Sequence, residues 1–159
     1  FADAAEEYDE KIDFAVINSG ALRQDLDAGI LTKGDLISAF PFPNTLVMTK
    51  ITGAQIEGLF NHAAGMTNGV LQVSKSFKYV IDSNGEIKEL RLNGKPINRK
   101  KTYWVASTNF VTLGGDGYWE FTESIEYEDT NIFIVDVVED YLKDKPRYSP
   151  VYEERIVIE

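Results

Sequence analysis

The chain has 159 residues, an ordinary size for one domain and enough to bury roughly 70% of the surface that the unfolded chain exposes. Its hydrophobic fraction of 43% is that of a globular protein, and its net charge of −10 makes DNA or an RNA polymer an unfavourable partner. The sequence holds no cysteine, which excludes disulfides and thiolate metal sites, and no apolar run that predicts a transmembrane segment.

The first segment, FADAAEEYDEKI (residues 1–12), has Ala, Glu and apolar residues at helical spacing and predicts a helix whose start is missing. Because the chain begins at Phe1 without a methionine, we expect it to be a fragment of a longer protein. The next run, DFAVINS (13–19), is continuously β-prone and therefore predicts a buried strand.

Two helices are predicted from their capping residues. Thr32 with an acid at Asp35 is typical of a helix start, and KGDLISAF then predicts a short helix that ends before Pro41. Thr52 is placed to cap a second helix over GAQIEGLFNHAAGM (53–66). The apolar residues of this helix fall on one face at i, i+3, i+4 and i+7: Ile56, Leu59, Phe60 and Ala63.

The remaining segments predict strands, hairpins and one more helix. Strands are expected at 44–52 from the β-branched content, at 71–82 from alternation, at 102–110, and at the end of the chain over 151–159. The sequences SNGE (83–86) and Asn93–Gly94 are hairpin signals on either side of the strand at 87–97. Residues 131–143 predict an amphipathic helix. The mixture indicates a single α/β or α+β domain with mixed sheets.

The sequence contains few residues that could form a hydrolytic site. His62 is the one histidine of the chain and has no second histidine at i+4, so a helix-surface or packing role is the alternative to a ligand. There is no G-x-S-x-G motif and no cysteine for a nucleophilic triad. Mg²⁺ or Ca²⁺ sites made only of carboxylates stay open, but no EF-hand-like loop is present. A complete hydrolase centre is therefore not expected within these residues.

The stretch VINSGALR (16–23) ends a predicted strand with small residues between two polar ones. An amide at Asn18 can read the edge of a base, and the Arg23 guanidinium can bind phosphate or hydroxyl oxygens. Loops at strand ends are where ligands bind in α/β sheets. The alternative is an ordinary turn that carries a surface arginine.

Two phenylalanines are candidates for stacking on a planar ligand. Phe42 lies between two prolines, which predict a stiff, extended loop, and Phe110 leads into the glycine turn GGDG (114–117). Two rings on opposite faces of a base contribute about 1–3 kcal/mol per stacked base. The alternative is that both rings belong to the core.

The motifs INSGALR, GILTKGDL, FPFPN, KITGAQIEGLF and STNFVTLGGDGY occur in this order, and the chain resembles the C-terminal domain of the 5′-nucleotidase / UDP-sugar hydrolase family. The resemblance covers nearly the whole chain, 1–159, as one domain. It implies a layered α/β/β/α domain with mixed sheets.

The resemblance also implies a function. In such enzymes an N-terminal calcineurin-like domain, absent from this chain, carries a catalytic Asp–His pair and two divalent metal ions of the Zn, Mn, Co or Mg type, whereas the C-terminal domain binds the nucleoside. We therefore expect no cofactor and no catalytic residue in this chain. Its expected partners are a nucleoside or nucleotide and its own catalytic domain, in an extracytoplasmic (periplasmic, cell-surface or secreted) nucleotide phosphohydrolase.

The family's functional positions can be transferred residue by residue. Its paired stacking phenylalanines match Phe42 and Phe110, and its base-contacting amides match Asn18 and Asn44. The G-G-D-G acid, which accepts hydrogen bonds from ribose hydroxyls, matches Asp116. The positions implied to bind substrate are Asn18, Arg23, Phe42, Asn44, Phe110, Gly115 and Asp116.

One departure from the family pattern concerns this same site. Many members have Asn-Gly-Gly-Gly where this chain has Asn18-Ser-Gly-Ala, and Ala21 narrows the turn. Arg23 is implied to lie toward ribose and phosphate, but the family's basic residue upstream of the first helix is missing from the chain, so we expect an incomplete phosphate site.

Two other functions stay open. One is a relative that acts on 2′,3′-cyclic nucleotides, as a phosphodiesterase and 3′-nucleotidase, or on UDP-sugars. The other is a non-catalytic surface domain for interaction with other proteins, in which Phe42 and Phe110 would pack inward.

Overall fold

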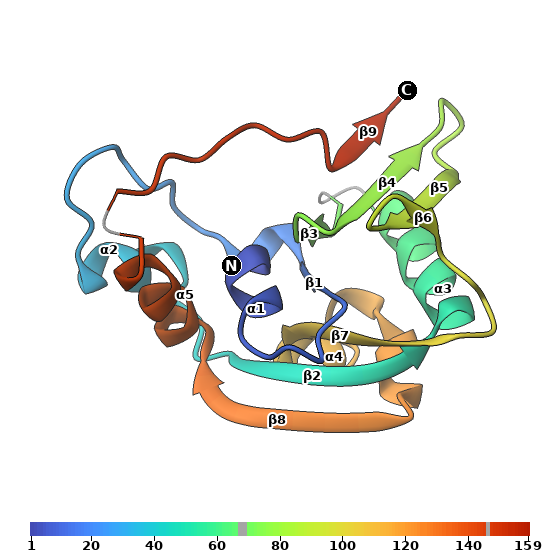
Figure 1. Cartoon of the computed structure of the whole chain (residues 1–159), viewed down its shortest axis with the longest axis horizontal. Coiled ribbons are helices and arrows are strands. Elements are labelled where there is room, and N and C mark those ends of the chain that lie inside the picture. Colours follow the sequence, from blue (N-terminus) through green and yellow to red (C-terminus); the bar gives the residue numbers. More distant parts are fainter. Residues whose placement is uncertain (67–69, 146) are drawn as a thin grey trace.

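The protein, described by a computed structural model over residues 1–66, 70–145 and 147–159, is built on two mixed β-sheets (Figure 1). The first sheet has the strand order β3-β1-β7-β2-β8, and the second has the order β6-β5-β4-β9. The strands are β1 (Phe14–Ile17), β2 (Thr45–Thr52), β3 (Gln72–Val73), β4 (Phe77–Ile81), β5 (Ile87–Leu92), β6 (Lys95–Pro96), β7 (Thr102–Thr108), β8 (Glu126–Phe133) and β9 (Ile156–Ile158).

The helices begin where the sequence offers capping groups. The Thr32 and Thr52 side chains each accept a hydrogen bond from the third helical N–H, and the side chains of Asp35 and Gln55 complete a capping box at each start. These predicted helix starts are confirmed. The α-helices are α1 (Ala2–Glu6), α2 (Lys33–Ala39), α3 (Gly53–Ala64), α4 (Asn109–Thr112) and α5 (Ile134–Lys143), and short 3₁₀ turns are η1 (Ser19–Ala21), η2 (Gly115–Gly117) and η3 (Trp119–Glu123). Within the described ranges, no helix is long and apolar enough to cross a membrane.

Strand β1 is an interior strand of the first sheet and is buried on both faces. It runs parallel to β7 and antiparallel to β3, and its successive side chains point to opposite sides of the sheet. Phe14 and Val16 join the core that faces the second sheet, whereas Ala15 joins the core beneath α1 and α5. The expected buried strand is confirmed, and its end at Ile17 places the following loop at the edge of the sheet.

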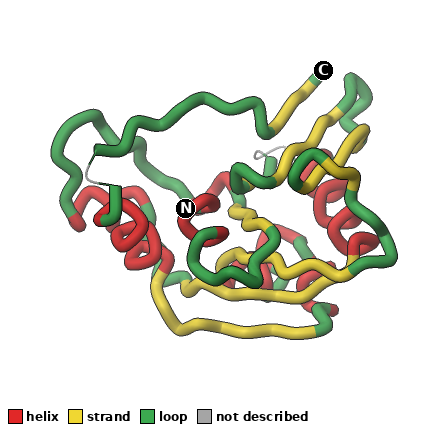
Figure 2. The backbone as a smooth tube through the Cα atoms, viewed as in Figure 1, coloured by secondary structure: helices red, strands yellow, loops and turns green. Residues whose placement is uncertain are grey.

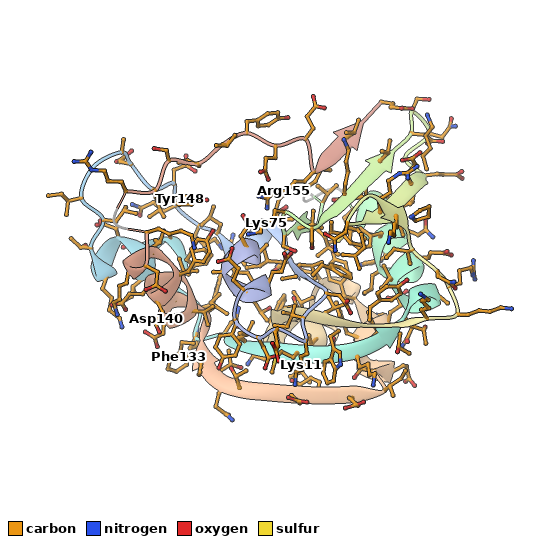
Figure 3. The ribbon with its side chains drawn as sticks, in the orientation of Figure 1. Lys11, Lys75, Phe133, Asp140, Tyr148 and Arg155 are labelled. Atoms are coloured by element: carbon orange, nitrogen blue, oxygen red, sulfur yellow. The ribbon has the colours of Figure 1, made fainter. Side chains whose placement is uncertain are left out.

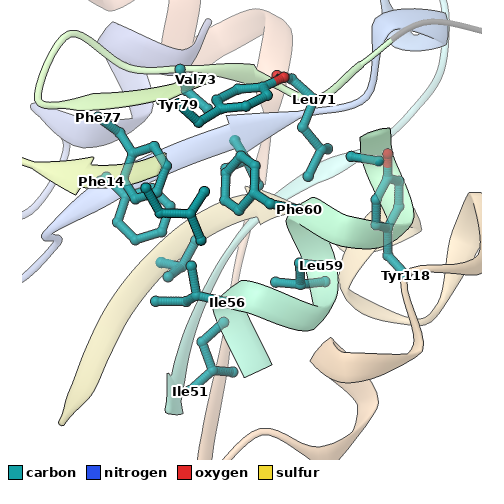
Figure 4. Close-up of a cluster of buried hydrophobic side chains, with 14 of the residues drawn as sticks. Phe14, Ile51, Ile56, Leu59, Phe60, Leu71, Val73, Phe77, Tyr79 and Tyr118 are labelled. Carbon is teal, nitrogen blue, oxygen red and sulfur yellow. The ribbon is translucent and has the colours of Figure 1, made fainter. Parts of the chain in front are cut away.

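The larger core joins the two sheets through aromatic rings (Figure 4). The Phe77 ring of β4 stacks on Phe14 of β1 at 4.2 Å between centroids and on Phe60 of α3 at 4.9 Å. The Tyr79 hydroxyl in this core donates to the Leu71 carbonyl oxygen at 2.7 Å. The predicted apolar face of α3 is confirmed, since Ile56, Leu59, Phe60 and Ala63 are all buried.

The opposite face of the first sheet is covered by helices. Ala5 of α1 and Val137 of α5 pack with Ala15, Leu46 and Ala106 of β1, β2 and β7. The expected layered α/β architecture with mixed sheets is thereby confirmed. The small residues of this core let α1 lie close to the strands.

The expected single strand over 71–82 is wrong. The chain forms β3 in the first sheet and β4 in the second, with a break at residues 74–76. At this break the Ser74 N–H donates to the Ala15 carbonyl oxygen at 3.0 Å, and the Ser74 hydroxyl accepts from the Ala15 N–H at 2.9 Å. Ser74 therefore ends the pairing with β1, and the chain changes sheets there.

Three further elements differ from expectation. Figure 2 shows the helices and strands along the backbone. Strand β8 was not predicted, because it is an edge strand whose residues are exposed or half-buried and include three acids, Glu126, Glu128 and Asp129. The helix expected over 131–143 begins at Ile134, after β8 ends. The strand expected over 151–159 is confined to β9.

The last strand is tied to the start of the chain. Arg155, which is labelled in Figure 3, directly precedes β9. Its guanidinium donates to the Asp3 carboxylate through Nη1 at 2.7 Å and Nη2 at 2.8 Å. It also donates to the Val73 carbonyl oxygen at 3.0 Å. This bidentate pair fixes the residue before β9 to α1, while β9 itself pairs in parallel with β4.

Candidate functional site

A cavity of about 470 Å³ opens where the loop after β1, the loop before β2 and the segment after β7 come together. Its size lies within the range of small-molecule sites, about 300–1,000 Å³. Three aromatic residues and both signs of charge line it. The lining residues are Asn18, Ser19, Gly20, Ala21, Arg23, Phe42, Asn44, Met66, Phe110, Asp116 and Tyr118.

Both phenylalanine rings are accessible at this cavity. Phe42 is 41% exposed and Phe110 is 43% exposed, and the two residues come from segments that are far apart in sequence. The Arg23 guanidinium carbon lies 5.2 Å from the Phe42 ring centroid, a cation–π distance. Inward packing of the two rings, the alternative considered above, is not what the structure has.

Phe110 lies in a helix and not in the strand expected over 102–110. Strand β7 ends at Thr108, whose hydroxyl accepts from the Val111 N–H at 3.2 Å and caps α4. The threonine cap starts a helical turn directly after the strand, and this turn directs Phe110 to the cavity.

Gly115 does not line the cavity but lies directly beneath Phe110. A Cβ atom at position 115 would lie 2.5 Å from the Phe110 carbonyl oxygen and 2.6 Å from the Phe110 ring. Such distances are far below van der Waals contact, so only glycine permits this ring position.

Asn109 connects the segments that carry the two rings. Its side-chain oxygen accepts from the Phe110 N–H at 2.9 Å and from the Thr45 N–H at 3.2 Å. Thr45 directly follows the loop that carries Phe42 and Asn44. One carboxamide therefore fixes the backbone on both sides of the cavity.

Asp116 is held by a residue from the other end of the chain. The Asn18 Nδ2 donates to Asp116 Oδ2 at 2.7 Å. Asn18 is 8% exposed, whereas Asp116 is an exposed residue with a left-handed φ of 54°. The Asn18 Oδ1 is buried and has no hydrogen-bond partner among the described residues. The contact between Asn18 and the acid was not foreseen from the sequence, which associates Asn18 with a base.

Two further residues of the lining, Met66 and Tyr118, were not predicted from the sequence. The Tyr118 hydroxyl donates to the Met66 sulfur at 3.1 Å. Burial, and secondly the negative charge of Asp116, raise the pKa of Tyr118, so its hydroxyl stays protonated. An aromatic residue directly after GGDG was a signal for Tyr118, whereas nothing in the sequence singles out Met66.

Among the described residues of the lining, the charged groups are one cation, Arg23, and one anion, Asp116. An ionised carboxylate accepts hydrogen bonds from hydroxyls, and a guanidinium donates to anionic oxygens. Across the described ranges, no three His, Cys, Asp or Glu side chains are grouped so that they could hold a metal ion. The described lining thus offers groups that are chemically complementary to a flat apolar ring, to hydroxyls and to an anionic group.

This fold agrees with what comparison with known proteins gives. The profile of the family described as "5′-nucleotidase, C-terminal domain" matches residues 1–123, and the chain belongs to this family. The resemblance identified from the sequence motifs is thereby confirmed.

Individual relatives support the same assignment. Protein UshA of Yersinia enterocolitica is 32% identical over 141 residues, which cover 87% of this chain and 25% of that protein. The trifunctional nucleotide phosphoesterase YfkN of Bacillus subtilis is 34% identical over 157 residues, which cover 89% of this chain and 11% of that protein. The chain thus spans a quarter or less of the length of these two relatives.

Solved structures share the fold. The 5′-nucleotidase precursor from Thermus thermophilus superposes with a TM-score of 0.90 at 24% identity, over 98% of this chain and 34% of that one. The NAD nucleotidase of Haemophilus influenzae superposes with a TM-score of 0.87 at 22% identity, over 99% of this chain and 31% of that one.

Proposed function

We propose that this chain is the substrate-binding and specificity domain of a secreted, metal-dependent nucleotide phosphohydrolase of the 5′-nucleotidase / UDP-sugar hydrolase type. The observation that carries the proposal is the presence of two exposed phenylalanine rings, a carboxylate and a guanidinium at one cavity. A nucleotide has a complementary group for each of them.

The base would lie between Phe42 and Phe110. Both rings are accessible at the cavity, and base–aromatic stacking contributes about 1–3 kcal/mol per base. Stacking tolerates every base, so discrimination between bases falls to polar groups at the edge. Asn44 lines the cavity and offers a carboxamide for this edge.

The sugar and phosphate would lie toward the charged residues. Asp116 has one carboxylate oxygen bound to Asn18, and its other oxygen is available to accept from ribose hydroxyls. Arg23 lies beside the Phe42 ring, where its guanidinium can donate to the phosphate oxygens or a ribose hydroxyl. Arg23 is the cation that the described residues of the lining offer to the phosphate.

Hydrolysis would require a partner domain. In the proposed full-length protein, an N-terminal domain supplies two divalent cations, which activate a water molecule and stabilise charge on the phosphoryl oxygens. The contribution of residues 1–159, a single domain, is to bind and orient the nucleotide, and correct orientation is worth many orders of magnitude in rate. The chain alone would bind nucleosides weakly and hydrolyse nothing. We place the full-length protein outside the cytoplasm.

A second candidate function is that of a phosphoesterase with a wider substrate range, which includes 2′,3′-cyclic nucleotides and 3′-nucleotides. The 34% identity to a protein named trifunctional nucleotide phosphoesterase favours it. The same cavity would serve, because the base and the sugar ring are unchanged in these substrates. A substrate panel on the full-length protein separates the two candidates.

The test is direct binding by calorimetry or saturation-transfer NMR, with adenosine, AMP and uridine on this chain. We expect binding that Phe110→Ala abolishes while the far-UV circular dichroism stays unchanged. Phe133→Ala is the matched control, since Phe133 is 47% exposed at the end of β8 and lies outside the cavity lining. Folded wild-type protein that binds none of the three ligands at millimolar concentration contradicts the proposal.

A further inference from the structure

His62 reaches the turn that carries Asp116, although it does not line the cavity. It lies in the last turn of α3, and its Nε2 is 2.8 Å from the Asp116 carbonyl oxygen. Its ring meets the Tyr118 ring edge-on, at 5.0 Å between centroids and 87° between planes. A carbonyl oxygen accepts only, so Nε2 carries the proton and donates.

The turn that receives this hydrogen bond is conformationally demanding. Asp116 has a φ of 54°, and left-handed backbone costs a non-glycine residue energy unless its surroundings hold it there. Two contacts hold it: Asn18 binds the carboxylate, and His62 binds the carbonyl oxygen. They come from different parts of the fold, the end of β1 and the end of α3.

Gly117 leaves room for this arrangement. A Cβ atom at position 117 would lie 2.9 Å from both Cε1 and Nε2 of His62. A side chain there would push the imidazole away from the Asp116 carbonyl oxygen. Glycine at position 117 is thus needed for two reasons: it leaves space for the His62 ring, and it adopts a left-handed φ of 86°.

We propose that His62 is a positioning residue of the nucleoside site, which fixes the backbone of the 115–117 turn so that the Asp116 carboxylate stays directed at the ribose hydroxyls. The role in ribose binding rests on the proposed function. The hydrogen bond between His62 and the Asp116 carbonyl oxygen does not rest on the proposed function, because it is made between two residues of this chain.

The first experiment compares adenosine with 2′,3′-dideoxyadenosine, which lacks both hydroxyls that the carboxylate would bind. Wild-type protein should prefer adenosine. His62→Ala should weaken adenosine binding about three- to tenfold, the range that one hydrogen bond contributes, and leave dideoxyadenosine binding within about twofold. His62→Gln, which keeps a side-chain N–H donor, should recover part of the loss. Asn61→Ala, an exposed neighbour on α3, is the control.

Equal losses for the two ligands, or no loss for adenosine, would overturn the inference, because a generally disturbed fold does not distinguish them. Amide hydrogen exchange without ligand gives the second readout. The Gly117 N–H bonds the Gly114 carbonyl oxygen and the Tyr118 N–H bonds that of Gly115, and both should exchange faster in His62→Ala. Unchanged exchange overturns the inference alone, whereas wild-type protein that binds neither nucleoside overturns the proposed function and the ribose role together.

Discussion

Asn18 donates a hydrogen bond to Asp116 at 2.7 Å, across a sequence separation of 98 residues. The donor is buried at the end of β1, whereas the acceptor is exposed at the cavity. A rigid strand end therefore orients an accessible acid, which lowers the cost of ordering that acid when a ligand binds.

Replacing the donor with a second acid gives the first prediction. In Asn18→Asp two carboxylates would face each other at this short distance, and like charges so close cannot both stay ionised without cost. We expect weaker adenosine binding than in Asn18→Ala at pH 7, with part of the loss recovered toward pH 5 as one carboxyl takes up a proton and donates to the other. Calorimetry from pH 7 to pH 5 measures the adenosine affinity of Asn18→Asp. An affinity that does not rise on acidification contradicts the prediction.

The second prediction concerns the glycine beneath the phenylalanine ring. In Gly115→Ala the new methyl group overlaps the Phe110 ring and carbonyl oxygen, so the ring must leave its place. We expect adenosine affinity to fall about tenfold or more and stability to fall by about 1–3 kcal/mol, as overpacking does. Urea unfolding and calorimetry measure the two effects.

Gly34→Ala in α2 is the control for this substitution. Its Cβ atom would meet the Thr32 hydroxyl oxygen at an ordinary 3.5 Å, and alanine favours a helix. If both glycine variants bind adenosine equally well, the ring position is not set by Gly115.

The third prediction concerns the Asn109 carboxamide, which connects the start of β2 to the start of α4. Asn109→Ala leaves the Thr45 and Phe110 N–H groups without their acceptor, and we expect a loss of about 1–3 kcal/mol in the free energy of unfolding. Asn109→Asp keeps an acceptor oxygen at that place and should retain most of the stability and of the nucleoside affinity. The prediction fails if the aspartate variant is no better than the alanine variant in either measurement.

The fourth prediction is a pH dependence of stability at the Asp3–Arg155 pair. Burial raises the pKa of Asp3, but hydrogen bonds from Arg155 and the Lys75 N–H outweigh it, and the pKa lies below the ordinary 3.8. A lowered folded pKa means that the pair stabilises the fold above about pH 4 and that this contribution disappears as pH falls through the folded pKa.

Asp3→Asn should therefore cost about 1–2 kcal/mol in urea unfolding at pH 7, and the difference from wild type should shrink below pH 4. Asp25→Asn, at an exposed loop position, is the matched control and should change stability little at either pH. A cost for Asp3→Asn that grows on acidification would contradict the assignment.

The sequence predicts best those elements whose determinants are local. The Thr32 and Thr52 caps and the apolar face of α3 each depend on residues within a few positions, and all are confirmed. Residues 71–82 alternate except at Lys75 and Val80, and this local pattern does not give the change of sheets at Ser74, which depends on the distant partner Ala15. Strand β8 has no buried face to give a pattern.

The candidate site shows the same division. From the residues alone, Phe42 and Phe110 were as compatible with a core as with a ligand, and the family resemblance was needed to bring them together. The structure has both rings exposed at one cavity. The hydrogen bonds that reach Asp116 from Asn18 and His62 join segments far apart in the chain, and no spacing rule connects such positions.

The second sheet offers a practical consequence. Among the described residues that line the cavity, none comes from β4, β5, β6 or β9, and the tip of the β4–β5 hairpin at residues 83–86 is exposed. Since the sequence has no native thiol, Ser83→Cys would create a unique attachment point for a fluorophore or spin label. Such a reporter would lie on the second sheet, away from the described residues that line the cavity.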